Sequence, residues 1–410
     1  SQHSDGLLNR RPAGATIRRN GQFSAVRVSR VPVSNDPFGA QPGLRDALSR
    51  ALAWQTTPPI KVDRPGSPAH GAILHGFDTR EGKPLGAYTE ITGYGISLFA
   101  FLQRTRGDTS FNGAARAAAD YLLSVQTSDG AYPHLPDPAS PSARGPLYAF
   151  DTGVCIVGMA RLAKASKEAR DRESVLAAGK WLLGMQRGDG SFSSMQREDG
   201  VVVDPGGFYG DGSCIHAKNA IALLELHALS GGEQWREAAV RACDHVLTLQ
   251  APDGAFWSVP DRRYVFTHAH CYACEGLLFA GELLGEERFT AAARRGIAWL
   301  AATQQAEGGW LSHYKASLGS PRRMLEVLSR PMPSDAAAQA ARLFALSGEE
   351  HESHRRSAIG FLLGCQDRDG GFFYRRTRFG YTPVLYTWSA QFAVQALEWS
   401  MTTADVRDLF

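Results

Sequence analysis

The chain has 410 residues, of which 43% are hydrophobic and 21% are charged, and its formal net charge is +3. These proportions are typical of a folded globular protein with one large domain or two ordinary ones. So small a net charge does not favour nucleic-acid binding, and no apolar run approaches the roughly 20 residues of a membrane span.

Residues 1–40 are rich in Arg, Ser, Pro and Gly and show no lasting periodicity, which predicts an irregular N-terminal arm. They contain no apolar signal-peptide core, so we expect a cytoplasmic protein, although the missing initial Met leaves secretion open. The six cysteines are scattered, mostly within helical patterns, and we expect buried thiols instead of a disulfide framework.

A helix is predicted from Leu44, and from Glu90 onward two kinds of helix alternate. Helices that are apolar on nearly every side are interior, and helices with one polar face pack outside them. The later interior helices are expected to begin near Asp151, Ile215, Thr267, Ser334 and Tyr386, and their outer partners near Ala169, Gln234, Glu287 and Glu352.

The last interior helix has no following partner, and the helix at Leu44 has no preceding one. Pairing these two closes a ring of six couplets, so the sequence predicts an all-α (α/α)6 barrel over residues 41–404 instead of an open solenoid. The longest loops precede the inner helices, and long ordered loops usually carry function. We therefore expect the site where the inner helices begin.

A Gln-x-x-Asp/Glu-Gly motif followed by an aromatic residue ends most of the outer helices. Its glutamines are Gln126, Gln186, Gln250, Gln304 and Gln366. Glycine supplies the left-handed backbone that ends a helix, and we expect the glutamine amide to bind neighbouring backbone. The motif therefore predicts the fold and not the chemistry.

These repeats over about residues 85–400 resemble two families of α/α toroids. One comprises six-hairpin carbohydrate enzymes, which include glycoside hydrolases, polysaccharide lyases and sugar epimerases. The other comprises terpenoid cyclases and protein prenyltransferases. The resemblance is specific for architecture and weak for reaction.

The sequence contains neither the D-x-D-D cluster of class II terpene cyclases nor the D-D-x-x-D motif that holds magnesium and diphosphate. Protein prenyltransferases use an Asp, Cys and His zinc set, for which His268, His270, Cys271 and Cys274 could be considered. On a helix, however, His268 shares a face with the two cysteines while His270 lies about 100° from Cys271. We expect a packed cysteine pair beneath a functional histidine, with no metal and no cofactor.

The starts of the inner helices gather acids, histidines and aromatic residues, which suit general acid/base chemistry on a sugar. The candidate catalytic residues are Glu90, Tyr94, Asp151, His216, His268, Asp335 and Tyr386. His270 and Trp388 are candidate substrate-binding residues. Each of these residues also has a purely structural interpretation, such as a helix cap for Asp151 and Asp335. The functional interpretation therefore depends on all of them lying together at the starts of the inner helices.

The long loops carry many arginines, and six helix N-termini point to the same end, so we expect a mouth that prefers an anion. The candidate arginines are Arg144, Arg263, Arg323 and Arg376. Arginine holds a carboxylate through two parallel hydrogen bonds. The predicted substrate is therefore an acidic saccharide such as a uronate.

Two mechanisms remain open. In a hydrolase, Asp151, whose Phe-Asp-Thr-Gly segment resembles a helix start of unsaturated-uronyl hydrolases, would donate a proton, and Glu90 or Asp335 would act as base or nucleophile. In a lyase or epimerase, which we prefer slightly, Tyr94, His268 or Tyr386 would remove the proton beside the carboxylate. The alternatives are a terpenoid-cyclase-like enzyme and a non-catalytic toroid that binds a glycan or a protein.

Overall fold

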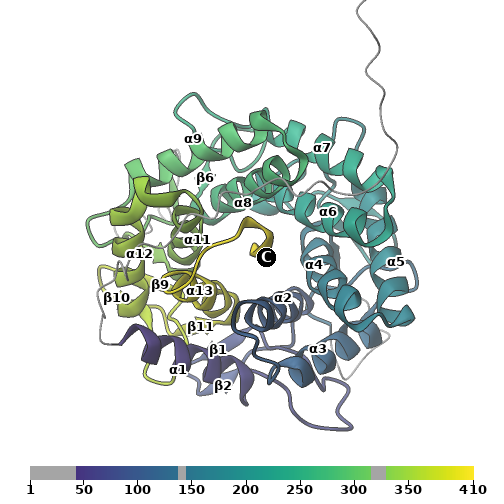
Figure 1. The fold of residues 1–410 in the computed structure, drawn as a ribbon, viewed down its shortest axis with the longest axis horizontal. Coiled ribbons are helices and arrows are strands. Elements are labelled where there is room, and N and C mark those ends of the chain that lie inside the picture. The colour runs from purple at the N-terminus through teal and green to yellow at the C-terminus, as the bar shows by residue number, and fades with distance from the viewer. Residues whose placement is uncertain (1–42, 137–144, 315–328) are drawn as a thin grey trace, which may run out of the picture. The chain divides into compact units, whose positions relative to one another are not determined.

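The computed structural model describes residues 43–136, 145–314 and 329–410, so the predicted arm of residues 1–40 lies outside the described residues. Within these ranges, six inner helices line the centre of a ring (Figure 1). They are α2 (Thr89–Arg106), α4 (Ala149–Ser166), α6 (Asn219–Ser230), α8 (Thr267–Leu284), α11 (Ser334–Leu346) and α13 (Thr387–Trp399).

The outer layer consists of α1 (Leu44–Thr56), α3 (Asn112–Val125), α5 (Ala169–Met185), α7 (Glu233–Leu247), α9 (Glu287–Thr303) and α12 (Glu352–Cys365). The inner helix α4 is buried on nearly every side, whereas α3 buries one face only. Helix α1 packs against α13 and closes the ring. The predicted (α/α)6 barrel is confirmed.

The inner helix expected near Ile215 differs in its first turn. A 3-10 segment, η2 (Cys214–Lys218), precedes α6, and the Ser213 hydroxyl accepts a hydrogen bond from the Ile215 amide at 3.4 Å. Tighter turns of this kind are common at helix ends.

Each repeat glutamine ties one outer helix to the next, as predicted. The Gln126 side-chain amide donates to the carbonyls of Gly130 in its own turn, at 2.8 Å, and Ser174 in α5, at 2.9 Å. The last copy, Gln366, donates to the Ala47 carbonyl in α1 at 2.8 Å and so completes the circle. Further pairs involve Gln186 with Gly190 and Ala238, Gln250 with Gly254 and Ala292, and Gln304 with Gly308 and His354.

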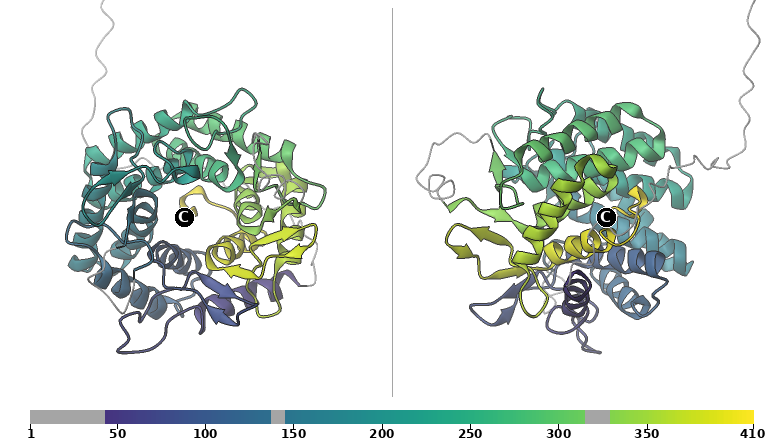
Figure 2. Two further views of the ribbon diagram at one scale, coloured as in Figure 1. Left: turned by 180° about the vertical axis from the view of Figure 1, so that it is seen from behind. Right: turned by 60° about the vertical axis from the view of Figure 1, so that its left-hand side comes forward.

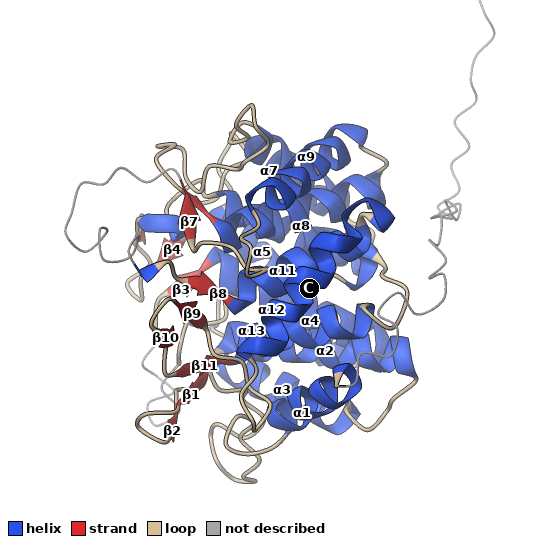
Figure 3. Ribbon diagram, turned by 90° about the vertical axis from the view of Figure 1, so that its left-hand side faces the viewer, coloured by secondary structure: helices blue, strands red, loops and turns tan. Residues whose placement is uncertain are grey.

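Short antiparallel strands gather at the end where the inner helices begin, here called the mouth (Figure 3). Three sheets have the orders β11-β1-β2, β10-β9-β8 and β3-β4-β5, and β6 pairs with β7. Several strands, such as β6 and β11, lead directly into inner helices. Their bounds are β1 (Gly76–Asp78), β2 (Lys83–Pro84), β3 (Leu147–Tyr148), β4 (Met195–Gln196), β5 (Val202–Val203), β6 (Val265–Phe266), β7 (His313–Tyr314), β8 (Met332–Pro333), β9 (Arg375–Thr377), β10 (Gly380–Tyr381) and β11 (Val384–Tyr386).

The C-terminal segment, residues 400–410, turns back into the ring and contains the 3-10 turn η4 (Val406–Asp408); Figures 1 and 2 show its end at the centre. Two further 3-10 turns are η1 (Gly207–Tyr209) and η3 (Gly348–His351). The six cysteines are free and buried, as predicted. Among the described helices, none combines the length and the apolar character needed to cross a bilayer.

Candidate functional site

Two buried carboxyl groups lie together at the mouth, in the first turns of neighbouring inner helices. Asp151 of α4 accepts hydrogen bonds from the Tyr88 hydroxyl at 3.2 Å and from His134 Nδ1 at 2.6 Å. The same Tyr88 hydroxyl also hydrogen-bonds Glu90 of α2. One phenol therefore links the two carboxyl groups that the sequence analysis singled out.

The two carboxyl groups differ in their surroundings. Burial raises the pKa of Glu90 well above its usual value, and the charge of Asp151 raises it further; Tyr88 and Lys218 oppose this shift without reversing it. Glu90 therefore keeps its proton at a pH where an ordinary glutamate is ionised. The result is a proton donor beside the carboxyl group of Asp151, whose partners are His134 and Tyr88.

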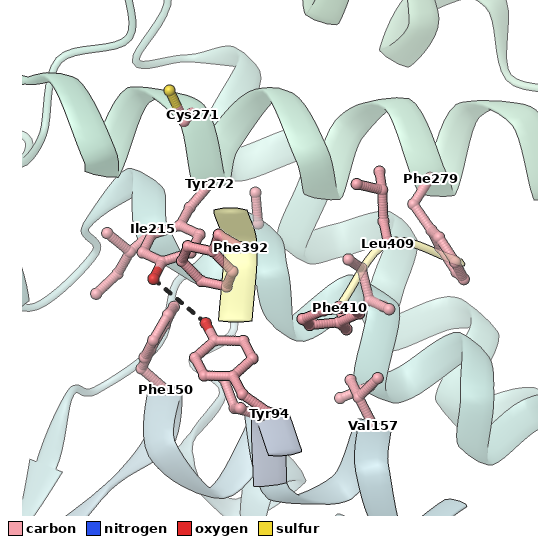
Figure 4. Close-up of a cluster of buried hydrophobic side chains, with 14 of the residues drawn as sticks. Tyr94, Phe150, Val157, Ile215, Cys271, Tyr272, Phe279, Phe392, Leu409 and Phe410 are labelled. Carbon is pink, nitrogen blue, oxygen red and sulfur yellow. Dashed lines mark hydrogen bonds between the residues drawn. The ribbon is translucent and has the colours of Figure 1, made fainter. Parts of the chain in front are cut away.

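Tyrosines from opposite sides of the ring meet one helical turn below this pair. The hydroxyl groups of Tyr94 on α2 and Tyr272 on α8 are 3.3 Å apart and are drawn in Figure 4. Residues i and i+4 of a helix lie on the same face. Glu90 precedes Tyr94 by four residues and His268 precedes Tyr272 by four, so Glu90 and His268 face the bore from opposite helices, one turn nearer the mouth.

His268 lies half-buried in the first turn of α8, with its ring edge-on to Phe208 at a centroid distance of 4.5 Å. Burial lowers its pKa, against the opposing charge of Asp335. Asp335 itself accepts a hydrogen bond from Trp388 Nε1 at 3.0 Å. Burial therefore favours the neutral form of the His268 imidazole, as it favours the protonated form of Glu90 on α2.

Three half-buried rings stack beside this acid and base. The Tyr386 and Trp388 rings are 4.2 Å apart, and His75 lies against them at 4.9 and 5.2 Å. Burial and the neighbouring His134 lower the pKa of His75 to about 4, so its ring is neutral. Such a stack offers a flat apolar face bordered by polar groups.

The two tyrosines predicted as bases are buried to different degrees. Burial raises the pKa of Tyr94 well above its usual value and also raises that of Tyr386. Both shifts make the phenols harder to ionise, so among the three residues predicted as a base His268 is the one whose neutral form burial favours.

His216 and His270, predicted at the mouth, lie between the inner and outer layers. His216 contacts the Ser194 hydroxyl at 3.0 Å and the Asn219 amide at 3.3 Å. His270 accepts from the Phe256 amide at 3.0 Å, and its other ring nitrogen lies 3.0 Å from the Gly296 carbonyl. Both ring nitrogens of each histidine therefore have partners within the protein.

The buried cysteines of α8 also contact a histidine. Cys274 Sγ lies 3.6 Å from Nε2 of His270. In residues 43–136, 145–314 and 329–410, no three His, Cys, Asp or Glu side chains are grouped so that they could hold a metal ion.

Two of the four predicted arginines lie within the described residues. Arg144 and Arg323 lie outside the described residues. Arg263 is exposed and pairs with Asp261, while Arg376 lies over the Phe361 ring of α12 at 5.9 Å.

Its neighbour Arg375 lies near the site, within the described part of the chain. Its charge lowers the pKa of His268, and its guanidinium lies over the Tyr374 ring at 4.9 Å. The Nε atom of Arg375 is buried without a hydrogen-bond partner. A buried donor of this kind suits an anionic ligand.

Four residues at the site were not predicted from the sequence: His75, Tyr88, His134 and Tyr272. His75 and His134 lie in irregular loops, where no periodicity indicates which way a side chain points. Tyr88 directly precedes α2, and Tyr272 lies one turn after His268, so their helix positions were the available signals.

The fold and this mouth define a six-hairpin α/α toroid. Residues 148–376, more than half of the chain, match the squalene-hopene cyclase C-terminal domain model, and the chain belongs to that family. The drimenyl diphosphate synthase of Streptomyces showdoensis is 30% identical over 224 residues, which are 53% of this chain and 35% of that protein. The chain thus spans about a third of this curated relative.

Solved structures with the same fold carry other activities in their names. A sugar epimerase from a ruminal bacterium has a TM-score of 0.72 at 11% identity, over 87% of this chain and 97% of its own. The unsaturated glucuronyl hydrolase of Bacillus sp. GL1 has a TM-score of 0.61 at 15% identity (86% and 96% covered). The type II terpene cyclase MstE from Scytonema has a TM-score of 0.55 at 17% identity (86% and 96% covered). At these identities the likeness establishes the fold alone.

Proposed function

We propose that this protein is an enzyme that moves a proton on a saccharide, with His268 as the base and Glu90 as the acid. The observation that carries the proposal is the placement of Glu90 and His268 in the first turns of α2 and α8, four residues before Tyr94 and Tyr272, whose hydroxyl groups are 3.3 Å apart. A base and an acid on opposite sides of a bound molecule are what a proton transfer at carbon requires. The sugar epimerase fold likeness is consistent with this chemistry.

His268 would remove the proton from a sugar carbon beside a carbonyl or carboxylate. Glu90 would donate its proton to the oxygen on which negative charge develops, beside Asp151, which is paired with His134 and Tyr88. Return of the proton from His268 to the other face of the carbon, while Glu90 recovers the proton from the oxygen, gives an epimer. Loss of a leaving group that takes the proton from His268, again with Glu90 recovering its own proton, gives an unsaturated sugar.

The ring stack of His75, Tyr386 and Trp388 supports a sugar as the substrate, because the C–H faces of sugars are apolar. The buried, unpartnered Nε of Arg375 supports an acidic one, since it could donate to a carboxylate.

Hydrolysis is the nearer alternative, and the Glu90–Asp151 pair favours it. There Glu90 would protonate the leaving oxygen, the role first assigned to Asp151, and Asp151 would be the base. The glucuronyl hydrolase likeness is consistent with such a pair.

Prenyl chemistry is the second candidate, favoured by the family match. A protonated Glu90 above the rings of Tyr94, Tyr272 and Phe392 could protonate an alkene. Against it, histidines and tyrosine hydroxyls crowd the mouth, and the sequence lacks the D-x-D-D cluster.

The test is incubation with uronate-containing and neutral saccharides in D2O, alongside prenyl diphosphates. Deuterium in recovered sugar indicates epimerisation, ultraviolet absorbance of a new conjugated double bond indicates a lyase, and new reducing ends indicate hydrolysis. His268→Gln should abolish deuterium incorporation, while the control His227→Gln, at the far end of α6, should not.

Conversion of prenyl diphosphates alone would overturn the proposal. A pure binding protein would bind a glycan with unchanged affinity in the Asp151→Ala and His268→Ala variants.

A further inference from the structure

The end of the ring opposite the mouth is filled by the C-terminal segment. Leu409 and Phe410 are 0% and 1% exposed, and Figure 4 shows them among the side chains of the inner helices. The Phe410 ring lies 6.2 Å from the Tyr94 ring and 6.3 Å from the Phe392 ring. The segment therefore forms the layer beneath the Tyr94–Tyr272 pair.

Side chains of the inner helices fix the backbone of this segment. Arg161 of α4 donates to the carbonyls of Arg407 at 3.0 Å and Leu409 at 2.8 Å. Gln395 of α13 donates to the Asp408 carbonyl at 2.8 Å. Because each of these carbonyls accepts a hydrogen bond from a side chain, the hydrogen bonds hold the backbone next to Phe410 in one position.

Phe410, the last residue of this segment, binds the buried ammonium group of Lys218. The Phe410 carbonyl accepts a hydrogen bond from Lys218 Nζ at 2.6 Å, and the ammonium also pairs with Glu275. Glu275 pairs in turn with Arg342. The ammonium lies 5.0 Å from the centre of the Tyr272 ring, within the range of a cation–π contact.

Lys218 thus contacts the Tyr94 and Tyr272 rings on the side away from the mouth, whereas Glu90 and His268 lie one helical turn nearer the mouth. Its Nζ is 5.7 Å from the Tyr94 ring centre, and Glu90 is one turn above Tyr94 on α2. We propose that Lys218, held by Phe410 and Glu275, is a positioning residue of the candidate site that acts on Glu90 through the Tyr94–Tyr272 pair. The proposal rests on the catalytic role given to Glu90 above.

Several charged and titratable groups surround the two partners. Glu90 faces Asp151 and Cys155 of α4 and the phenols of Tyr88, Tyr94, Tyr209 and Tyr272. Lys218 faces Glu275 of α8, Arg342 of α11 and Arg161 of α4. Of these groups, Lys218 is the cation whose charge lowers the pKa of Glu90, against burial and Asp151.

Lys218→Gln isolates this link, because the amide can still donate to the Phe410 carbonyl while the charge is lost. Infrared titration of the Glu90 carboxylic C=O band, identified as the band missing in Glu90→Gln, measures the pKa without a substrate. We expect Lys218→Gln to raise the Glu90 pKa and Glu275→Gln to lower it. A role in packing alone would not move the pKa in opposite directions.

The control is Lys164→Gln, which removes another cation that is paired with a buried carboxylate, Glu225, near the far end of the ring. It should leave the Glu90 band in place. An unchanged Glu90 pKa in whichever of Lys218→Gln and Glu275→Gln folds would overturn the inference. Because no turnover is measured, this result is independent of whether any saccharide is converted.

Discussion

Removal of the Gln366 side chain should weaken the ring where its two ends join. Its amide nitrogen donates to the carbonyls of Ala47 at 2.8 Å and Gly370 at 3.3 Å, and its oxygen accepts from Arg50 at 2.8 Å. Three hydrogen bonds at roughly 0.5–1.5 kcal/mol each give an expected loss of about 1.5–4.5 kcal/mol for Gln366→Ala.

Urea unfolding followed by circular dichroism measures this loss, provided that the slope against urea stays constant. Gln103→Ala is the control, because Gln103 is exposed at the far end of α2 and should change stability by less than about 0.5 kcal/mol. Equal stabilities of the two variants would refute the idea that the glutamine closes the ring.

The remaining predictions concern the site and the core. Glu90→Gln should slow turnover about 100- to 10,000-fold, whereas Glu282→Gln, an exposed position on α8, should leave the rate unchanged. Because the Glu90 pKa is higher in the folded than in the unfolded chain, the bound proton stabilises the folded protein at low pH, and this stabilisation is lost as the pH rises above the unfolded pKa of about 4.5. The melting temperature of Glu90→Gln should therefore rise relative to that of the parent chain above this pH. A difference in melting temperature that does not change with pH would contradict the raised pKa. Glu275→Ala leaves Lys218 and Arg342 buried without their carboxylate and should cost about 3–5 kcal/mol in urea unfolding. A loss below about 1 kcal/mol would show that these cations are hydrated.

The architecture could be predicted because burial follows the helical period. Helices apolar all round, such as α4, had to be interior, and the unpaired helices at Leu44 and Tyr386 required closure. The repeat turns were equally predictable, because a left-handed glycine such as Gly370, with φ of +102°, is needed where the turn meets the next helix. A Cβ on Gly370 would lie 2.2 Å from the Arg50 carbonyl.

The site was predictable only as far as helix position determines direction. Glu90, Asp151 and His268 occupy first turns whose inward faces are set by the period. His270, two residues after His268, points to another side of α8 for the same reason, and there it packs against Gly296 and Phe256, which one sequence does not reveal. Arg375 and Arg376 lie on adjacent strand positions that point to opposite faces, and the strands themselves are too short to be recognised from the sequence.

The acid–base pair across the mouth is tested most directly by proton exchange at carbon. A uronate-containing saccharide is incubated in D2O with the parent chain, Glu90→Gln and His268→Gln, and the sugar is examined by NMR. We expect deuterium at one sugar carbon with the parent chain and at least about a 100-fold slower exchange with either variant. Exchange at the parent rate in both variants would contradict the proposed acid–base pair of Glu90 and His268.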